Sequence, residues 1–153
     1  MYEPIRTKSV HTMADPEIPH RSREQELDIR LAGQLTALLT VTDELHAMAR
    51  RMGGGAQQDA GVDGAELDGD ELAAAAERIA EQVARLSGGH YPLRAEPTDG
   101  GTPSRIGALQ QRAHTLAGNA LAVATTRGDE AARELAAERM AAHALPLRDL
   151  ATA

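Results

Sequence analysis

Four stretches of this chain place apolar residues at three- and four-residue steps, which is the spacing of one helix face. The first and longest follows Ser22, which together with Gln25 has the spacing of a capping box. Its apolar stripe consists of Leu27, Leu31, Leu38, Val41, Leu45, Met48 and Met52. Because three glycines follow at 53–55, we expect a helix over about 22–52, roughly 45 Å long.

The other stretches predict three shorter helices, over about 69–87, 103–127 and 129–150. Their stripes are Leu72, Ala76, Ile79, Val83 and Leu86; then Ile106, Leu109, Ala113, Leu116, Ala120 and Val123; then Ala132, Ala136, Met140, His143, Leu147 and Leu150. Since Pro146 lacks an amide hydrogen, the last helix should kink there or end near Ala144.

Capping signals mark the helix boundaries. Asp68 and Glu71 again have capping-box spacing, and Thr102 precedes a proline in the first helical position. Gly128 followed by Asp129 fits a left-handed helix end that leads directly into the next N-cap. The last two helices should therefore form a tight antiparallel hairpin.

Composition supports helices over strands. The chain has no Phe or Trp, only Tyr2 and Tyr91 are aromatic, and no run alternates with the period of a strand. Leu and Ala must fill the core of a 153-residue chain, which has the length of one domain. We therefore predict an all-α protein, an antiparallel four-helix bundle over 22–153 with two long inter-helix connections.

Three segments lie outside these helices. Residues 1–21 hold three prolines and no periodic apolar face, which predicts a flexible, disordered N-terminal arm. Residues 53–67 are acidic and rich in glycine, which predicts a flexible linker. Between the second and third helices, Tyr91 and Leu93 are apolar enough for us to expect that this loop docks against the bundle.

Charge and cysteine content exclude several classes of function. The chain has no cysteine, which rules out disulfides, thiolate nucleophiles and cysteine-bound metals. Its net charge of −7 opposes nucleic-acid binding, for which Arg23, Arg30, Arg50 and Arg51 would have to converge on one face. The first residues lack the apolar region of a signal peptide, and no window is apolar enough to span a membrane. We expect a cytoplasmic protein that binds neither nucleic acid nor membrane.

The candidates for metal binding are few. Asp43 and His46 stand three residues apart, as in the Glu-x-x-His pairs of di-iron bundles, but a di-iron site needs two such pairs and this sequence has one. A surface ion pair or hydrogen bond explains Asp43 and His46 as well, and His143 is the third candidate. We therefore expect no metal and no cofactor.

Helix 129–150 also carries a row of acids. Glu130, Glu134 and Glu138 repeat every four residues, with Arg133 and Arg139 between them. Such a mixture predicts a solvated charged flank and not a carboxylate ladder for a cation.

His143 lies in an otherwise apolar stripe, where a base, a ligand or a core side chain are the alternatives. Its nearest helical acids do not share that face, so we predict a buried, neutral histidine hydrogen-bonded to another helix or to a carbonyl freed by Pro146. Burial should lower its pKa, and His143→Leu should be tolerated. His114 shares a helix side with Gly107 and Gly118, which indicates either an exposed face or a helix contact.

These features favour a non-enzymatic protein that acts through protein–protein contacts, as a self-associating chain or as a regulatory or accessory subunit. The first and third helices are longer than the second, so part of their apolar faces is free to form a homodimer. The alternative is a bundle that binds a metal or small molecule, or an enzyme, using His143 with Asp43, His46 or the acids Glu134 and Glu138.

Overall fold

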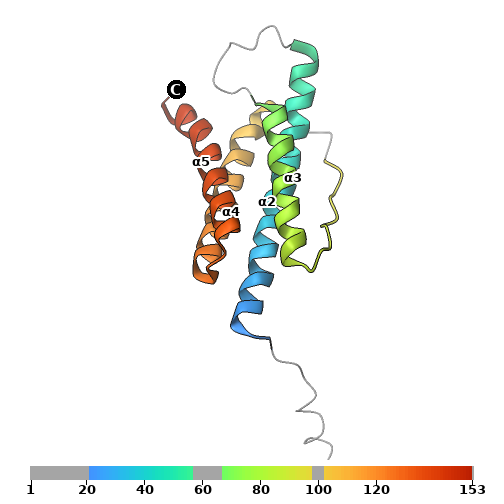
Figure 1. The fold of residues 1–153 in the computed structure, drawn as a ribbon. Helices are drawn as coiled ribbons and strands as arrows, with labels where there is room; N and C mark the ends of the chain where they lie inside the picture. Colours follow the sequence, from blue (N-terminus) through green and yellow to red (C-terminus); the bar gives the residue numbers. More distant parts are fainter. Residues whose placement is uncertain (1–20, 57–66, 98–101, 153) are drawn as a thin grey trace, which may run out of the picture.

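The computed structural model describes residues 21–56, 67–97 and 102–152, and this part of the chain contains helices and no strand. The helices are α2 (Arg23–Ala56), α3 (Gly69–Leu86), α4 (Ile106–Arg127) and α5 (Glu130–Thr152), with a 3₁₀ turn, η3 (Pro103–Arg105), before α4. They pack lengthwise as an antiparallel four-helix bundle, as predicted (Figure 1). Among these helices none is long and apolar enough to cross a bilayer. Residues 1–20 of the predicted arm and 57–66 of the predicted linker lie outside the described residues.

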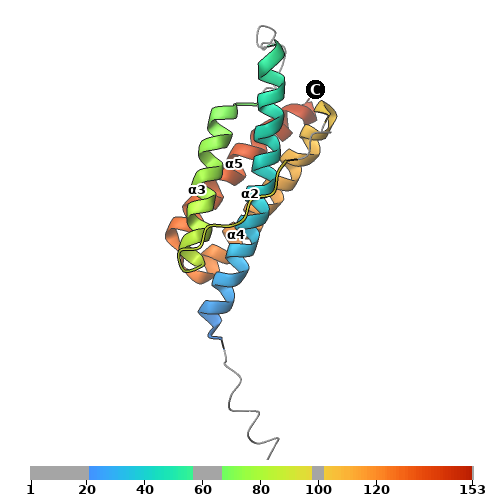
Figure 2. The same ribbon diagram turned by 90° about the vertical axis from the view of Figure 1, so that its right-hand side faces the viewer.

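Each helix of the bundle is antiparallel to its two neighbours. Helix α2 packs against α3 and α4, α4 packs against α5, and α3 faces α5 across the remaining side. The segment after α3 passes over the outside of α2 toward the start of α4 (Figure 2). Because this connection returns along the bundle, α3 and α4 run in the same direction at opposite corners. The sequence left this topology open.

Several predicted caps are confirmed. The Gln25 amide donates to Ser22 Oγ at 3.1 Å, and the Ser22 amide donates to Gln25 Oε1 at 2.8 Å. Gly128 has a φ of 77°, and Asp129 Oδ1 accepts a hydrogen bond from the Ala132 amide at 3.1 Å. Local sequence therefore sets these ends of α2, α4 and α5.

Other predicted boundaries are wrong. Helix α2 does not end at the glycines 53–55 but continues to Ala56, because glycine weakens a helix and ends it only where the backbone turns left-handed. Helix α5 does not end near Ala144 and continues past Pro146. Thr102 makes no side-chain cap and bonds Ser104 Oγ instead.

The core combines leucines from α2 with alanines from the other helices. The fully buried alanines of α4 and α5 are Ala113, Ala117, Ala120, Ala124, Ala132 and Ala136. In α4 the predicted stripe is rotated: Ala117 and Ala124 face the core, while Leu116 and Val123 are only partly buried. Alanine allows close helix approach, and the long side chains of α2, such as Leu35 and Leu38, fill the centre.

Truncating one of these central leucines should be costly. We expect Leu38→Ala to lower the free energy of unfolding by about 2–5 kcal/mol, because alanines on the facing helices cannot fill the cavity. The matched variant Leu116→Ala, at a partly buried position, should cost less than half as much. Urea denaturation of both variants measures the difference, and equal losses would contradict this account of the core.

Candidate functional site: a buried polar network

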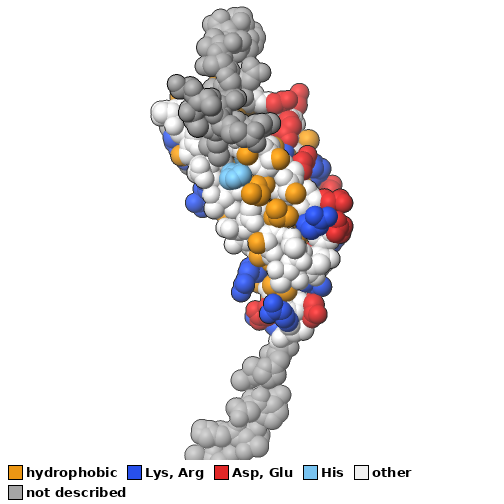
Figure 3. Space-filling view, turned by 90° about the vertical axis from the view of Figure 1, so that its left-hand side faces the viewer, with side chains coloured by type: hydrophobic (Ala, Val, Ile, Leu, Met, Phe, Trp, Pro, Cys, Tyr) orange, Lys and Arg blue, Asp and Glu red, His pale blue; other side chains and the backbone are white. Residues whose placement is uncertain are grey.

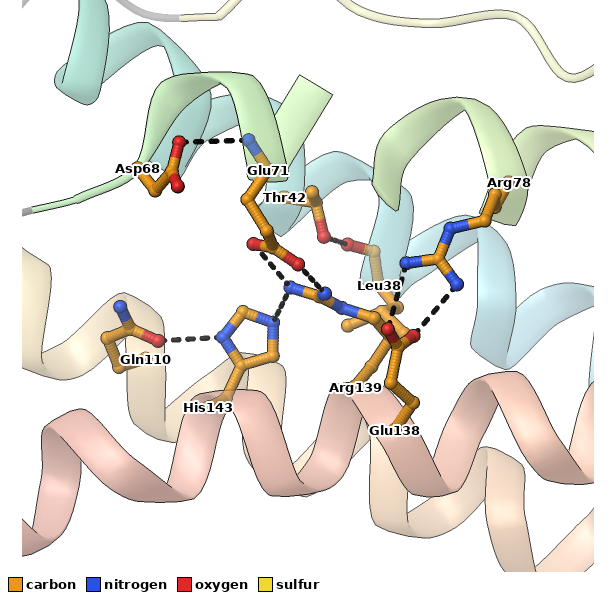
Figure 4. A network of polar contacts seen from close by, with 9 residues as sticks. All are labelled: Leu38, Thr42, Asp68, Glu71, Arg78, Gln110, Glu138, Arg139 and His143. Atoms are coloured by element: carbon orange, nitrogen blue, oxygen red, sulfur yellow. Dashed lines mark hydrogen bonds and ion pairs between the residues drawn. The ribbon is translucent and has the colours of Figure 1, made fainter. Parts of the chain in front are cut away.

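A polar network joins α3, α4 and α5 inside the bundle (Figure 4). Its centre is Arg139 of α5, whose side chain is only 1% exposed. The Arg139 guanidinium donates to both carboxylate oxygens of Glu71 on α3, and its Nη2 lies 3.3 Å from His143 Nε2. A buried cation is thereby paired with an anion from another helix and with an imidazole one turn away.

His143 has partners on both ring nitrogens. Its Nδ1 lies 2.7 Å from Oε1 of Gln110 on α4. Because arginine only donates, Nε2 accepts from Arg139 and Nδ1 carries the proton that it donates to Gln110. The predicted hydrogen bond to another helix is confirmed, but its partner is the Gln110 amide and not a carbonyl freed by Pro146.

The environment of His143 favours the neutral ring. Burial, the positive charge of Arg139 and the neighbouring His114 together lower its pKa from 6.5 to about 4, and burial makes the largest contribution. The side chain is 2% exposed. The predicted neutral core histidine is therefore confirmed.

Arg139 lies inside the bundle, where the sequence predicted a solvated flank. It is among the most deeply buried side chains of the described residues. The steps from Ala132 to Ala136, Arg139 and His143 are four, three and four, so Arg139 belongs to the buried stripe as its spacing allows. Met140, which was assigned to that stripe, is only partly buried. The side chains of Leu147 and Leu150 lie outside the described part.

The acidic row Glu130, Glu134 and Glu138 is exposed, as predicted for a solvated charged flank. Glu130 forms an ion pair with Arg133 one turn away. Glu138 accepts from Arg78 of α3 at 2.8 Å, on the surface.

Ion pairs cross the side between α3 and α5. The backbones of these two helices approach each other at few points. Three arginine–carboxylate pairs bridge them: Glu71 with Arg139, Arg78 with Glu138, and Arg85 with Asp129. On α3 these residues recur every seven positions, so they line one side of the helix. Glu71 has the predicted cap spacing, and its amide donates to Asp68 Oδ1, but its carboxylate turns to Arg139.

The metal candidates do not form a site. Asp43 forms its ion pair with Arg94 at 2.7 Å, and His46 lies near Gly69 on the α2/α3 side. Within the described residues no group of three His, Asp or Glu side chains could hold a metal. Asp43 and His46 are on α2 and His143 contacts Arg139 and Gln110, so the structure does not bring the three candidates together.

Arg94 fixes the segment after α3 to the bundle. It donates to Asp43 of α2 and to Glu77 of α3, and these two carboxylates raise its pKa above the usual value. The neighbouring Tyr91 and Leu93 were expected to dock against the bundle, but they are 63% and 98% exposed. The charged residue is the one that attaches this segment, and its apolar neighbours face outward.

His114 contributes to a helix contact and not to an exposed face. Its Nδ1 donates to the Met140 carbonyl at 3.1 Å, and a side chain at Gly118 would meet the end of Met140 at 3.7 Å. Of the two predicted alternatives for this side of α4, an exposed face or a helix contact, the helix contact is therefore correct.

The four arginines that would have to converge on nucleic acid are separated. Arg30 and Arg50 stand twenty positions apart on one continuous helix, or about 30 Å at 1.5 Å per residue. Arg23 and Arg51 lie still farther apart, so α2 presents two separate basic ends.

Chemically, all but one of the buried polar groups of this network have a partner. Both nitrogens of His143 are in use, Arg139 is paired, and the one buried network atom without a partner is the Arg139 Nε donor. These groups fix the positions of three helices.

Comparisons with protein families, curated proteins and solved structures each gave no match for this chain.

Proposed function

We propose that this chain is a non-enzymatic cytoplasmic protein that acts through protein–protein contacts, by self-association or as an accessory subunit. The observation that supports this best is the outward display of Tyr91 and Leu93 on a segment attached to the bundle by Arg94. Tyrosine and leucine exposed on an anchored segment lose little conformational entropy when a partner covers them.

The buried network supports the same proposal. A general base needs a ring nitrogen that can reach a substrate, and a metal ligand needs a free lone pair. In His143 one nitrogen accepts from Arg139 and the other donates to Gln110, which suits a structural role.

Self-association gives the direct test. We expect wild-type protein at micromolar concentration to have an average mass above one 16.2 kDa chain by light scattering. Leu93→Ser should weaken association about tenfold, because an exposed side chain that becomes buried contributes about 1–2 kcal/mol.

Ile29→Ser is the matched control, since Ile29 is also exposed but belongs to helix α2 and not to the anchored segment. It should leave the mass unchanged. A wild-type mass of one chain at every concentration would count against self-association.

A further inference from the structure

Two grooves on opposite sides of the bundle, one between α2 and α4 and one between α3 and α5, are bordered by exposed charges of opposite sign. Between α2 and α4 a groove of about 360 Å³ has Leu27, Ala122 and Val123 among its lining residues. Arg23 and Arg30 border this groove, are exposed, and form no ion pair within the described chain. We call this groove, with its two arginines, the basic groove.

The second groove lies between α3 and α5 and has a volume of about 320 Å³. Leu135 and Ala131 contribute its apolar lining, while Glu81 and Glu134 border it. Both glutamates are exposed, and neither forms an ion pair in the part that the structure covers. We call this the acidic groove.

The remaining charges in the grooves are already engaged. Glu26 in the basic groove forms an ion pair with Arg21 at 3.8 Å, and Arg78 in the acidic groove is paired with Glu138. Each groove therefore keeps two exposed charges of one sign that form no ion pair within the described residues, arginines in the first groove and glutamates in the second.

The grooves face away from each other. In the bundle α2 and α4 form one side and α3 and α5 form the opposite side. On the face shown in Figure 3, acidic side chains gather mainly along one long edge, while basic side chains lie on both edges. One copy cannot bring its own grooves together, but two copies can.

We propose that copies of this chain stack side by side, with the basic groove of one copy against the acidic groove of the next. A helix of one copy would lie in the groove of the other, as in ordinary helix packing, and Arg23 and Arg30 would pair with Glu81 and Glu134. This proposal rests on the proposed function, because it names the partner as a second copy.

The contact is heterologous, so each added copy leaves one groove of each kind open. Mass should therefore continue to rise with concentration beyond a dimer. A face two helices wide and about 30 Å long covers about 600 Å² per copy, or about 1,200 Å² in total, the lower end for specific interfaces. Association should accordingly be reversible and should weaken at high salt.

Two neutralised variants test this arrangement. Arg23→Gln with Arg30→Gln removes the basic groove's charges, and Glu81→Gln with Glu134→Gln removes those of the acidic groove. Each double variant alone should have a lower average mass than wild-type protein at the same concentration by light scattering, because the groove contact is lost while Leu93 is unchanged. Mixed in equal amounts, the variants should regain part of that mass by forming pairs, because one charged groove of each kind remains in the mixture. Circular dichroism checks that both variants fold.

The outcomes separate this proposal from the proposed function. If wild-type protein associates and either double variant retains its mass, or if mixing gives no pair, the groove-to-groove contact is wrong while self-association stands. If wild-type protein remains a single chain at low salt, both self-association and the groove contact fail.

Discussion

Replacing Glu71 with Ala is expected to lower the free energy of unfolding by about 2–3 kcal/mol at neutral pH, because it leaves the Arg139 cation buried without its anion. The loss is below the ~3–5 kcal/mol of a fully buried pair because the Glu71 side chain is 44% exposed and water reaches it. Asp70→Ala is the matched control: it removes a neighbouring exposed carboxylate from the same first turn of α3 and should cost below about 1 kcal/mol.

Arg139→Met gives the converse result. Methionine fills a similar space without a charge, and Glu71 can then turn to water, so this variant should lose less stability than Glu71→Ala. In the Arg139→Met background, Glu71→Ala should cost almost nothing. Urea denaturation of the four proteins measures the coupling. Additive effects would mean that the two side chains do not stabilise the fold as a pair.

Replacing His143 with Gln is expected to flatten the loss of stability on acidification. The pKa of His143 is about 4 in the folded protein and 6.5 in the unfolded chain, so the unfolded chain binds the proton first. Stability that is present above pH 6.5 is therefore lost as the pH falls toward 4, by about 3 kcal/mol in total. The groups that face His143 are Arg139 on its own helix, His114 on α4 and, through Arg139, Glu71 on α3.

Glutamine is the informative replacement because its amide can accept from Arg139 and donate to Gln110 without titrating. His143→Leu, expected from the sequence to be tolerated, should instead cost about 1–3 kcal/mol at pH 7, since Gln110 Oε1 would be left buried without its donor and Arg139 would lose one of its acceptors. His90→Gln, at an exposed loop position, is the control and should leave the pH profile as in wild type. An unchanged profile in His143→Gln would show that His143 is not the titrating group.

Much of the fold could be predicted because helices that bury one stripe repeat with a period that the sequence displays directly. The caps at Ser22 and Asp129 are equally local, since each involves residues three positions apart. The face of α4 that is buried could not be predicted from this period alone. Leu116 and Ala117 both fit a helical stripe, and the leucines of α2 decide which of them faces the core.

The centre of the network was predictable only in part. The position of His143 in the stripe indicated burial, and the structure confirms it. Arg139 shares that stripe, but arginine is rarely buried unless it is paired, and its partner Glu71 lies 68 positions away. Similarly, Leu93 is apolar yet exposed, because Arg94 and not the leucine attaches the segment to the bundle.

Native mass spectrometry of the purified 153-residue chain is the most direct test that the protein acts through contacts between chains and not through a bound metal or ligand. It reports the number of chains and any retained ligand in one spectrum. We expect assemblies whose masses are whole multiples of the 16.2 kDa chain, growing with concentration and carrying no added mass. A single chain that retains a metal ion or small molecule in stoichiometric amount would contradict the account.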